Sequence, residues 1–345
     1  MNSKVIKFVA GGGKTTRSLN ILKSKQNGLY LAYTNSVVNE ISSKGFLSKT
    51  IDSLFFGYII PKFTYIMPLI QNKKLVYKND KLLNDWQKGI LNIHINSDGT
   101  FMYKGRNQKK FSKTSFNLKM KWSDFLNSKD EQYYNVVKQL FNNDSVFLTN
   151  TLINELSDYL LENYPKQIIS ILQERFSYII FDEAQDLSAY REKFAIIVYK
   201  SNIPSIYLGD SNQNIMGGGK WFENLESNES NLICYRCSDA ICEVIREKTK
   251  IEIIGNDRHA KYYKITYDEV KKIDDGNRIL LYSKKTGYED LINNWKGIKM
   301  TIKSAKGSTI KNDIVLIGKT LNKKSFYVAL TRTTKNAFSC IEKIT

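Results

Sequence analysis

Two short segments carry side chains that could perform phosphate chemistry. Near the start of the chain, three glycines precede a lysine and a threonine in Gly11-Gly12-Gly13-Lys14-Thr15. Glycines let backbone N–H groups turn inward around an anion, lysine reaches phosphate oxygens, and a threonine hydroxyl can bind the same metal ion. Much later, the hydrophobic run Tyr178-Ile179-Ile180-Phe181 ends in Asp182-Glu183-Ala184-Gln185-Asp186. Together the two segments predict a site for a nucleoside triphosphate and Mg²⁺.

Each group in this predicted site has an expected role. We expect Lys14 to contact the phosphates, and Thr15 and Asp182 to hold magnesium. We expect Glu183 to orient or deprotonate the attacking water. The loop departs from the strict pattern G-x-x-x-x-G-K-[ST], whose first glycine would fall at Phe8. Taken alone, the loop could be a glycine-rich turn before a helix, and the acids could be a solvated turn.

The segments around these motifs alternate between short hydrophobic strands and helical stretches. Expected strands cover residues 5–9, 29–33, 178–181, 203–208, 278–282, 313–317 and 337–341. Expected helices cover residues 16–24 and 36–43 and lie within 144–175. This alternation is typical of an α/β fold with parallel sheets. At 345 residues the chain is long enough for two or three domains.

The chain is strongly basic, with a formal net charge of +18 and a pI of about 9.4. Such a charge favours a polyanionic partner, although a compositional bias toward Lys, Asn, Ile and Tyr would also produce it. Residues 62–125 hold 13 Lys and Arg against 4 Asp and Glu. The net charge of this segment, +9, is half of the net charge of the whole chain. Aromatic residues are interleaved with these lysines, and they are Trp86, Phe101, Tyr103, Phe111, Phe116 and Trp122.

This basic segment has two interpretations. Lysines together with aromatic residues suit a surface for single-stranded nucleic acid. The lysines would bind phosphates, and the aromatic rings would stack on bases. The same composition suits a small subdomain with an ordinary aromatic core and solvated lysines. Within the segment, residues 93–103 predict a β-hairpin that turns at Asp98-Gly99.

The four cysteines do not form a disulfide framework in a chain of this length, which favours a reducing compartment. Cys234, Cys237 and Cys242 are close in sequence and could suggest zinc. Neither histidine lies near them, and structural zinc sites use paired ligands at short spacing, so we do not expect a zinc site. No apolar run is long enough to cross a bilayer, and the N-terminal residues are unlike a signal peptide. The expectation is a soluble, cytoplasmic protein without a membrane partner.

Here the chain resembles the superfamily 1 helicases, especially the UvrD/Rep/PcrA type. The resemblance rests on motifs that occur in the family's order over nearly the whole chain. After the phosphate loop they are Leu31-Ala32-Tyr33-Thr34-Asn35 with Glu40, Thr50-Ile51-Asp52-Ser53-Leu54, the acidic box at 182–186, Gly209-Asp210-Ser211-Asn212-Gln213-Asn214-Ile215, Tyr235-Arg236-Cys237, Thr301-Ile302-Lys303-Ser304-Ala305-Lys306-Gly307 and Tyr327-Val328-Ala329-Leu330-Thr331-Arg332.

The resemblance implies a role for individual residues. Gln213 would sense the γ-phosphate, and Arg236 and Arg332 would neutralise charge on the transferred phosphoryl group. The nucleotide contacts it implies are Gly11, Gly12, Gly13, Lys14, Thr15, Thr16, Tyr235 (which would stack on adenine) and Gly307. The nucleic-acid contacts it implies are Thr34, Asn35, Thr50, Ser53, Thr301 and Lys303. For the arginines, the alternative is an ordinary surface salt bridge.

The resemblance also implies an organisation. It predicts two RecA-like P-loop domains, the first over 1–55 and 146–226 and the second over 227–345, with a basic insertion subdomain over 56–145. The two arginines would come from the second domain, so that the site is complete only when the domains close on ATP and Mg²⁺.

Several positions depart from the UvrD-like pattern. Asp52 replaces the usual histidine, and no glutamine motif that reads adenine precedes the first strand. Thr309 stands where UvrD-like proteins carry glutamate, so that this box and Tyr235-Arg236-Cys237 look more like RecD-type and viral RNA helicases. Gly217, Gly218 and Gly219 replace the usual base-stacking aromatic, and Trp221 follows later. The spacing between the Tyr235-Arg236-Cys237 box and the Lys306-Gly307 box leaves no room for the large second accessory domain that UvrD relatives carry.

These features predict an ATP-dependent helicase or translocase on single-stranded nucleic acid, with DNA favoured over RNA. The alternative is an ATP-gated clamp, or a regulator of a partner nuclease or replication protein, that does not unwind processively. A third hypothesis is a non-catalytic nucleic-acid-binding protein, against which the complete set of acids and arginines argues. The direction of movement stays open, because UvrD-like and RecD-like features imply opposite polarities.

Overall fold

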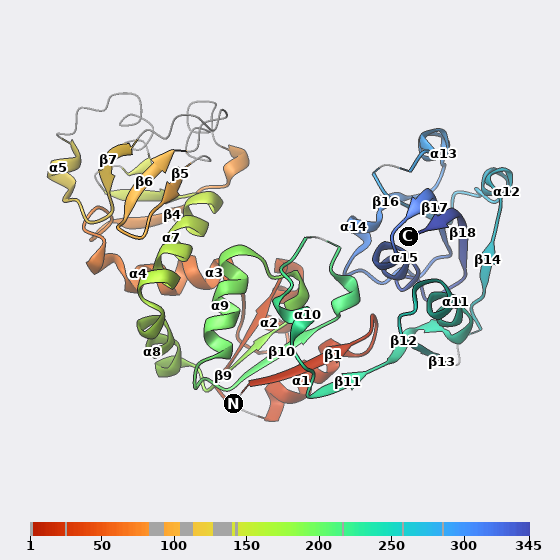
Figure 1. Ribbon diagram of the computed structural model, residues 1–345, viewed down its shortest axis with the longest axis horizontal. Helices are drawn as coiled ribbons and strands as arrows, with labels where there is room; N and C mark the ends of the chain where they lie inside the picture. Colours follow the sequence, from red (N-terminus) through yellow and green to blue (C-terminus); the bar gives the residue numbers. More distant parts are fainter. Residues whose placement is uncertain are drawn as a thin grey trace. The chain divides into compact units, whose positions relative to one another are not determined.

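In the computed structural model, the strand β17 (Ile314–Leu321) contributes residues to two hydrophobic cores in alternation. Ile314 and Leu316 pack into one core, and Val315 and Ile317 pack into the other. Successive strand residues point to opposite faces, so this burial means that both faces of the sheet are covered. The sheet has five parallel strands in the order β14-β18-β17-β15-β16. Figure 1 shows it in the C-terminal part of the chain.

Helices cover the two faces of this sheet. The first core joins β17 to α11 (Asp239–Thr249), α14 (Ile302–Ala305) and α15 (Lys323–Leu330). The second core joins it to α12 (Tyr267–Lys272) and α13 (Glu289–Asn294). The remaining strands of the sheet are β14 (Tyr262–Lys264), β15 (Ile279–Tyr282), β16 (Lys299–Thr301) and β18 (Ala337–Ile344).

The chain divides into two units, and the structure describes residues 3–24, 26–82, 93–103, 113–126, 140–141, 144–215, 217–256, 259–284 and 286–345, without the side chains of 102, 103, 113–116, 125 and 126. The first unit comprises Met1–Asn2, Asn27–Ile179 and Ala189–Pro204. The second unit comprises Ser3–Gln26, Ile180–Ser188 and Ser205–Thr345. The second unit therefore contains the glycine loop and the acidic box together with the whole five-stranded sheet.

The rest of the second unit is also built on parallel strands. β1 (Ser3–Phe8) pairs with β10 (Ser205–Gly209) on one side and with β11 (Glu229–Asn231) on the other. β12 (Ile233–Ser238) pairs with β13 (Ile254–Asn256). The helices of this region are α1 (Lys14–Ser24) and α10 (Trp221–Asn224), with short 3₁₀ turns at Ala184–Asp186 and Ser211–Gln213.

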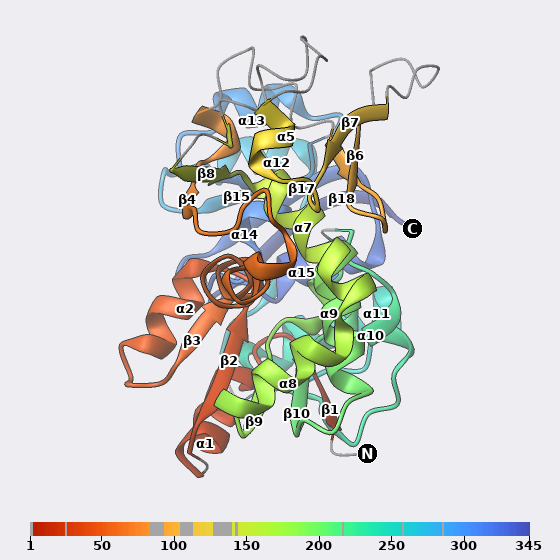
Figure 2. The ribbon, with the colours of Figure 1, turned by 90° about the vertical axis from the view of Figure 1, so that its left-hand side faces the viewer.

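The first unit pairs β2 (Gly28–Ala32) with β3 (Ser48–Thr50) in parallel and surrounds them with helices. α7 (Asn150–Asn163) runs beside α9 (Ala189–Tyr199), where Lys193 forms ion pairs with Asp158 and Glu162 (Figure 2). Its other helices are α2 (Asn35–Ser42), α3 (Ile51–Leu54), a π-helix at Phe55–Ile59, α4 (Ile60–Lys62), α5 (Trp122–Leu126) and α8 (Pro165–Arg175). β9 (Tyr178–Phe181) leads from this unit into the second.

The inserted segment of the first unit carries two small sheets. β4 (Lys74–Tyr77) pairs in parallel with β8 (Ser145–Leu148), although we expected helix from residue 144. β5 (Ile93–Ile95), β6 (Thr100–Tyr103) and β7 (Lys113–Asn117) form an antiparallel sheet. The predicted hairpin is confirmed, because Ile93 pairs with Tyr103 across a turn in which Gly99 has φ of +85°.

The predicted surface of lysines and aromatics in this segment is described only in part. Trp86 and Phe111 lie outside the described residues, as do the side chains of Tyr103 and Phe116. Phe101 is fully buried in the small sheet, which fits the interpretation as an aromatic core. Trp122 instead lies under the ammonium group of Lys73, whose Nζ is 3.0 Å from the ring centroid, so that this pair combines a cation with an aromatic face.

The α/β class with parallel sheets is confirmed. All seven strands predicted from the sequence are present, with ends that shift by up to four residues. Within the described ranges, none of the helices combines the length and the hydrophobicity needed to cross a bilayer.

We expect Leu316→Ala to lower the free energy of unfolding by about 2–5 kcal/mol, because it leaves a cavity in a covered sheet face. Leu316 is completely buried in the core that includes α11 and α15. Denaturant unfolding followed by circular dichroism measures the change. Thr320→Ala on the same strand is the matched control, since Thr320 is exposed. Equal stability of the two variants would contradict this packing.

Candidate active site

The acidic box occupies a sharp turn at the end of β9. Asp182 is buried directly after the strand, and Glu183 adopts a left-handed backbone with φ of +50°. Such a conformation is uncommon for a residue with a β-carbon and occurs often at functional sites. The 3₁₀ turn Ala184–Asp186 follows, so the box presents three acids within five residues of a fully buried strand.

Lys14 and Glu183 are brought together as an ion pair. Lys14 Nζ donates to Glu183 Oε2 at 2.7 Å, and Gln185 Nε2 donates to the same oxygen at 2.6 Å. Burial by itself would raise the pKa of Glu183, but Lys14 and these two hydrogen bonds outweigh it and lower the pKa to about 2. Burial opposes the charge of Lys14, yet the nearby acids Glu183, Asp182 and Asp210 raise its pKa. Both groups therefore carry full charge at neutral pH.

Gln213 follows β10 at the end of a second 3₁₀ turn and is almost completely buried. Its amide nitrogen donates to Asp210 Oδ2 at 2.9 Å, and its amide oxygen accepts from Arg332 Nη2 at 3.1 Å. Gln185 Oε1 accepts from the backbone N–H of Asp210 at 3.0 Å, which ties this turn to the acidic box. Gln213, the predicted γ-phosphate sensor, therefore lies in one hydrogen-bond network with Asp210, Glu183 and Arg332.

The two predicted arginines lie in this network as well. Arg332 is only 2% exposed and donates from Nε to the carbonyl of Val328. Burial first, and repulsion from Arg236 second, lower its pKa to about 10. Arg236 donates to the carbonyl of Thr331 at 2.8 Å. A β-carbon built on Gly11 would come within 2.9 Å of the Arg236 Cβ, so the arginine lies against the glycine loop.

Lys306 is a site residue whose partners could not be found in the sequence. Its Nζ forms an ion pair with Asp186 Oδ1 and donates to the carbonyl of Gln213 at 2.6 Å. The lysine and aspartate side chains are 9% and 3% exposed. Burial raises the pKa of Asp186 to about 6, although Lys306 opposes the shift. The lysine of the Lys-Gly box thus joins the acidic box to the sensor turn.

Among the glycines at 217–219, Gly218 is required for a steric reason. A β-carbon on Gly218 would lie 2.3 Å from the carbonyl oxygen of Gln185, so only glycine fits against the acidic box. Trp221, the next aromatic, packs edge-on against Tyr207 with ring centroids 5.4 Å apart. Trp221 therefore packs against a residue of β10 and does not take the place of the usual base-stacking residue.

Tyr235 lies beside the glycine loop with its ring open to solvent. Its backbone N–H donates to the Gly11 carbonyl at 3.1 Å, and its ring would be 3.6 Å from a β-carbon on Gly13. The side chain is 54% exposed. Thr15 is half-buried and Thr16 exposed at the start of α1, and Gly307 has φ of +83° after α14.

The predicted nucleic-acid residues share one structural setting. Thr34, Thr50 and Thr301 each cap the N-terminus of a helix, and each lies at or just after the end of a parallel strand. Ligands of α/β sheets bind at the carboxyl ends of strands, which is where these threonines lie. Ser53 donates its hydroxyl to the Thr50 carbonyl, while Asn35 and Lys303 are exposed. Thr34, Asn35, Thr50 and Ser53 belong to the first unit, and Thr301 and Lys303 belong to the second.

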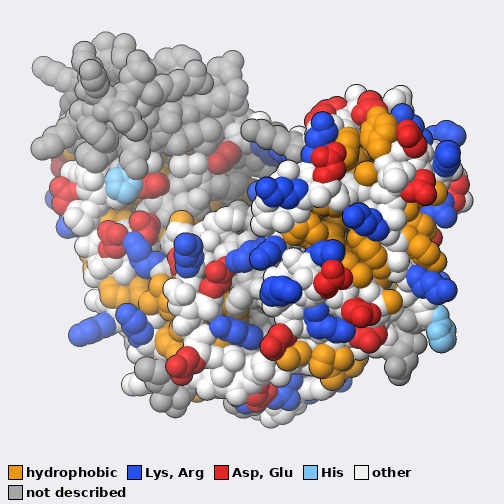
Figure 3. All heavy atoms as spheres, turned by 45° about the vertical axis from the view of Figure 1, so that its right-hand side comes forward, with side chains coloured by type: hydrophobic (Ala, Val, Ile, Leu, Met, Phe, Trp, Pro, Cys, Tyr) orange, Lys and Arg blue, Asp and Glu red, His pale blue; other side chains and the backbone are white. Residues whose placement is uncertain are grey.

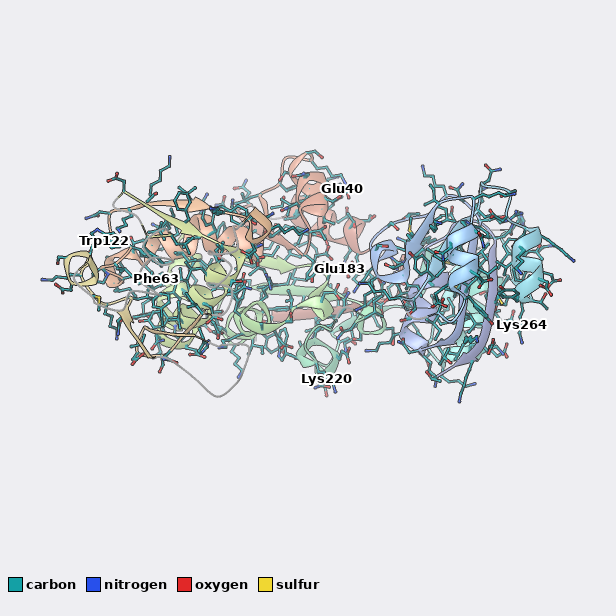
Figure 4. All side chains as sticks on the ribbon, turned by 90° about the horizontal axis from the view of Figure 1, so that it is seen from above. Glu40, Phe63, Trp122, Glu183, Lys220 and Lys264 are labelled. Carbon is teal, nitrogen blue, oxygen red and sulfur yellow. The ribbon has the colours of Figure 1, made fainter. Side chains whose placement is uncertain are left out.

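Basic side chains are spread over the face of the molecule shown in Figure 3, with acidic ones among them. In Figure 4, Glu183 marks the acidic box at the end of β9, and Lys264 projects from the edge strand β14. The cysteines Cys234, Cys237, Cys242 and Cys340 are all free and buried. Among the residues that the structure describes, no group of three or more His, Cys, Asp and Glu is arranged to hold a metal ion by itself.

The structure brings together one lysine from the glycine loop, the acidic box, a glutamine and two arginines. The family model described as the viral superfamily 1 RNA helicase core domain matches residues 136–338. The chain belongs to this family of viral superfamily 1 helicase core domains.

Solved structures of viral helicases are similar to the chain at low sequence identity. An arterivirus nonstructural protein 10 helicase in complex with DNA is 14% identical and has a TM-score of 0.46, with 98% of this chain and 60% of that chain covered. The PRRSV helicase is 12% identical with a TM-score of 0.48, and the match covers 99% of this chain and 52% of that one. The chain thus spans between half and two thirds of the length of these helicases. No curated protein is significantly similar to it.

We expect Lys306→Met to destabilise the protein by about 3–5 kcal/mol at pH 8, because it leaves the Asp186 carboxylate buried without its cation. The loss is smaller at pH 5. There the carboxyl, whose pKa is already raised to about 6, takes up a proton and no longer carries a buried charge. Denaturant unfolding at both pH values measures the effect.

The double variant Lys306→Met with Asp186→Asn is the control. It removes both charges and should recover most of the lost stability. A single variant as stable as the wild type at pH 8 would contradict the burial of this pair.

Proposed function

We propose that the chain is an ATP-dependent motor that moves along single-stranded nucleic acid. The observation that carries the proposal is the network within the second unit that joins Lys14, Glu183, Gln213 and Arg332. Phosphoryl transfer needs neutralisation of charge more than covalent chemistry, and this network concentrates the required groups. Nucleic acid bound at the carboxyl ends of the β-strands would then be coupled to the nucleotide.

The residues fit magnesium and a triphosphate. Thr15 and Asp182 offer the hard oxygen ligands that Mg²⁺ prefers, and they flank a lysine whose pKa is raised by three acids. We propose that Thr15 and Asp182 hold the ion, which would neutralise phosphate charge when bound. Lys14 would exchange Glu183 for phosphate oxygens, and the freed Glu183 would orient the attacking water. Arg236 and Arg332 would exchange a carbonyl and the Gln213 amide for phosphate oxygens.

We propose the domain organisation that the sequence predicts. Two RecA-like domains would cover 1–55 with 146–226, and 227–345, and the insertion would cover 56–145. The finer relationship within superfamily 1 favours the viral helicases over the UvrD/Rep/PcrA type, because the family match is to the viral core domain. The Tyr235-Arg236-Cys237 box and Thr309 support the same choice.

One observation favours the second candidate function, an ATP-gated clamp without processive unwinding. Next to the acidic box the chain carries Gly218, where a side chain would collide with Gln185, and Trp221 is packed on Tyr207. No aromatic ring among the described residues of this loop is placed to split a base pair. A clamp would hydrolyse ATP on a single strand without displacing a complementary one.

We expect hydrolysis of ATP by the full chain to rise about tenfold or more when a single-stranded oligonucleotide is added, because strand binding would favour the closed site. Matched DNA and RNA oligonucleotides decide which nucleic acid is preferred. A strand-displacement assay with opposite overhangs then separates a helicase from a clamp and gives the direction. An unchanged rate with both nucleic acids would contradict the motor and the clamp alike.

We expect Glu183→Gln to retain nucleotide binding while turnover falls about a hundredfold or more, as for loss of a general base. Glutamine keeps the shape of the side chain but cannot accept a proton. Glu226→Gln is the matched control, because Glu226 is an exposed acid of the same unit. Single-turnover hydrolysis and a fluorescent nucleotide titration give both quantities. Normal turnover in Glu183→Gln would reject the assigned role.

A further inference from the structure

Tyr327 is a buried tyrosine of α15 whose hydroxyl makes two hydrogen bonds to segments far away in the sequence. The hydroxyl donates to Asp210 Oδ2 at 2.6 Å and accepts from the backbone N–H of Ala10 at 2.7 Å. A backbone N–H can only donate, so the single proton of the phenol must point to the carboxylate. The hydroxyl therefore joins the entrance of the glycine loop to the residue that precedes the sensor turn.

The same carboxylate oxygen holds the Gln213 side chain. Asp210 Oδ2 accepts from the Gln213 amide nitrogen, while Oδ1 accepts from the backbone N–H of Asn212. The Gln213 amide oxygen accepts from Arg332. Only one orientation of the amide satisfies both neighbours, since a flipped amide would direct its NH₂ at the guanidinium and its oxygen at the carboxylate.

α15 thus controls both ends of the Gln213 amide. Tyr327 lies inside the helix, and Arg332 follows two residues after its end. The Tyr327 hydroxyl also accepts from the backbone N–H of Ala10, which immediately precedes Gly11-Gly12-Gly13. A movement of this helix that breaks the Tyr327 contacts would change the sensor and the glycine loop at the same time.

We infer that Tyr327 is a positioning residue that makes the site respond to the terminal phosphate. Its hydroxyl fixes Asp210, Asp210 fixes the Gln213 amide, and the bond from Ala10 fixes the loop entrance. The inference deepens the proposed function and rests on it. It predicts that loss of one oxygen atom weakens the discrimination between a nucleoside triphosphate and a diphosphate.

Tyr327→Phe in the full chain tests the inference. The ratio of Kd values for ADP and a non-hydrolysable ATP analogue, from fluorescent nucleotide titration, should fall about fivefold or more. The kcat of ATP hydrolysis should fall about tenfold, as expected when a hydrogen bond to a charged group is lost. Tyr262→Phe is the matched control, because the Tyr262 hydroxyl pairs with Ser339 in the same unit away from the site. It should leave the ratio and kcat within twofold of the wild type.

The same data distinguish a positioning role of Tyr327 from a purely structural one. It would lower the melting temperature and leave the Kd ratio unchanged, and that result would overturn the inference. A double-mutant cycle with Gln213→Ala gives a second readout. If Tyr327 acts through Gln213, Tyr327→Phe lowers kcat less in the Gln213→Ala background than in the wild type, whereas fully additive losses would contradict the inference.

Asp210→Asn serves if Tyr327→Phe does not fold. This substitution keeps the shape of the side chain but replaces one carboxylate oxygen with an amide nitrogen, so the ratio should fall as in Tyr327→Phe. An unchanged ratio overturns the inference. The outcome is distinct from failure of the proposed function, because in that case the wild type itself would hydrolyse no ATP.

Discussion

The structure depends on the mutual neutralisation of charges that are buried together. Asp182, Asp186, Asp210 and Arg332 are almost completely buried, and Lys306, Lys14 and Glu183 are mostly buried beside them. An isolated charge in such a place costs several kcal/mol, so each group is held by its partners. The directions of the pKa shifts follow from this balance: Glu183 beside Lys14 is lowered, whereas Asp186 and Asp210 are raised by burial.

This constraint explains why distant segments of the chain meet. The charged groups come from the glycine loop, the ends of β9 and β10, the Lys-Gly box and the end of α15. Parallel strands deliver such groups to one edge, because their carboxyl ends lie on the same side. The groups proposed to contact phosphates contact one another in the structure. In the proposed function, a triphosphate with its metal ion would replace these contacts, since it brings both negative oxygens and a cation.

Much of this could be predicted from the sequence. The central strands are mostly hydrophobic runs and were therefore predictable, and the acidic box and the arginines have distinctive residue types and order. Short edge strands such as β3 and β16 were not predicted, because three residues give no periodic signal. The sequence predicts helix where β8 lies, because the pairing of β8 with β4 is a tertiary contact that no local pattern encodes.

The partners of individual site residues could not be predicted. Tyr327 in a hydrophobic helix is indistinguishable from a core residue until its hydroxyl is placed beside Asp210. Lys306 belongs to a predicted box, yet nothing in the sequence links it to Asp186, 120 positions away. Local patterns specify elements, whereas a buried ion pair is fixed only by the three-dimensional arrangement.

In the proposed function, these paired charges would exchange one another for a triphosphate. A structure of the full chain with ADP, Mg²⁺ and aluminium fluoride, which mimics the transferred phosphoryl group, tests it most directly. The account predicts that Lys14 leaves Glu183 for the phosphates and that Arg236 and Arg332 both contact the fluoride. A complex in which Lys14 stays on Glu183, and the arginines keep their contacts with Thr331 and Gln213, would contradict it.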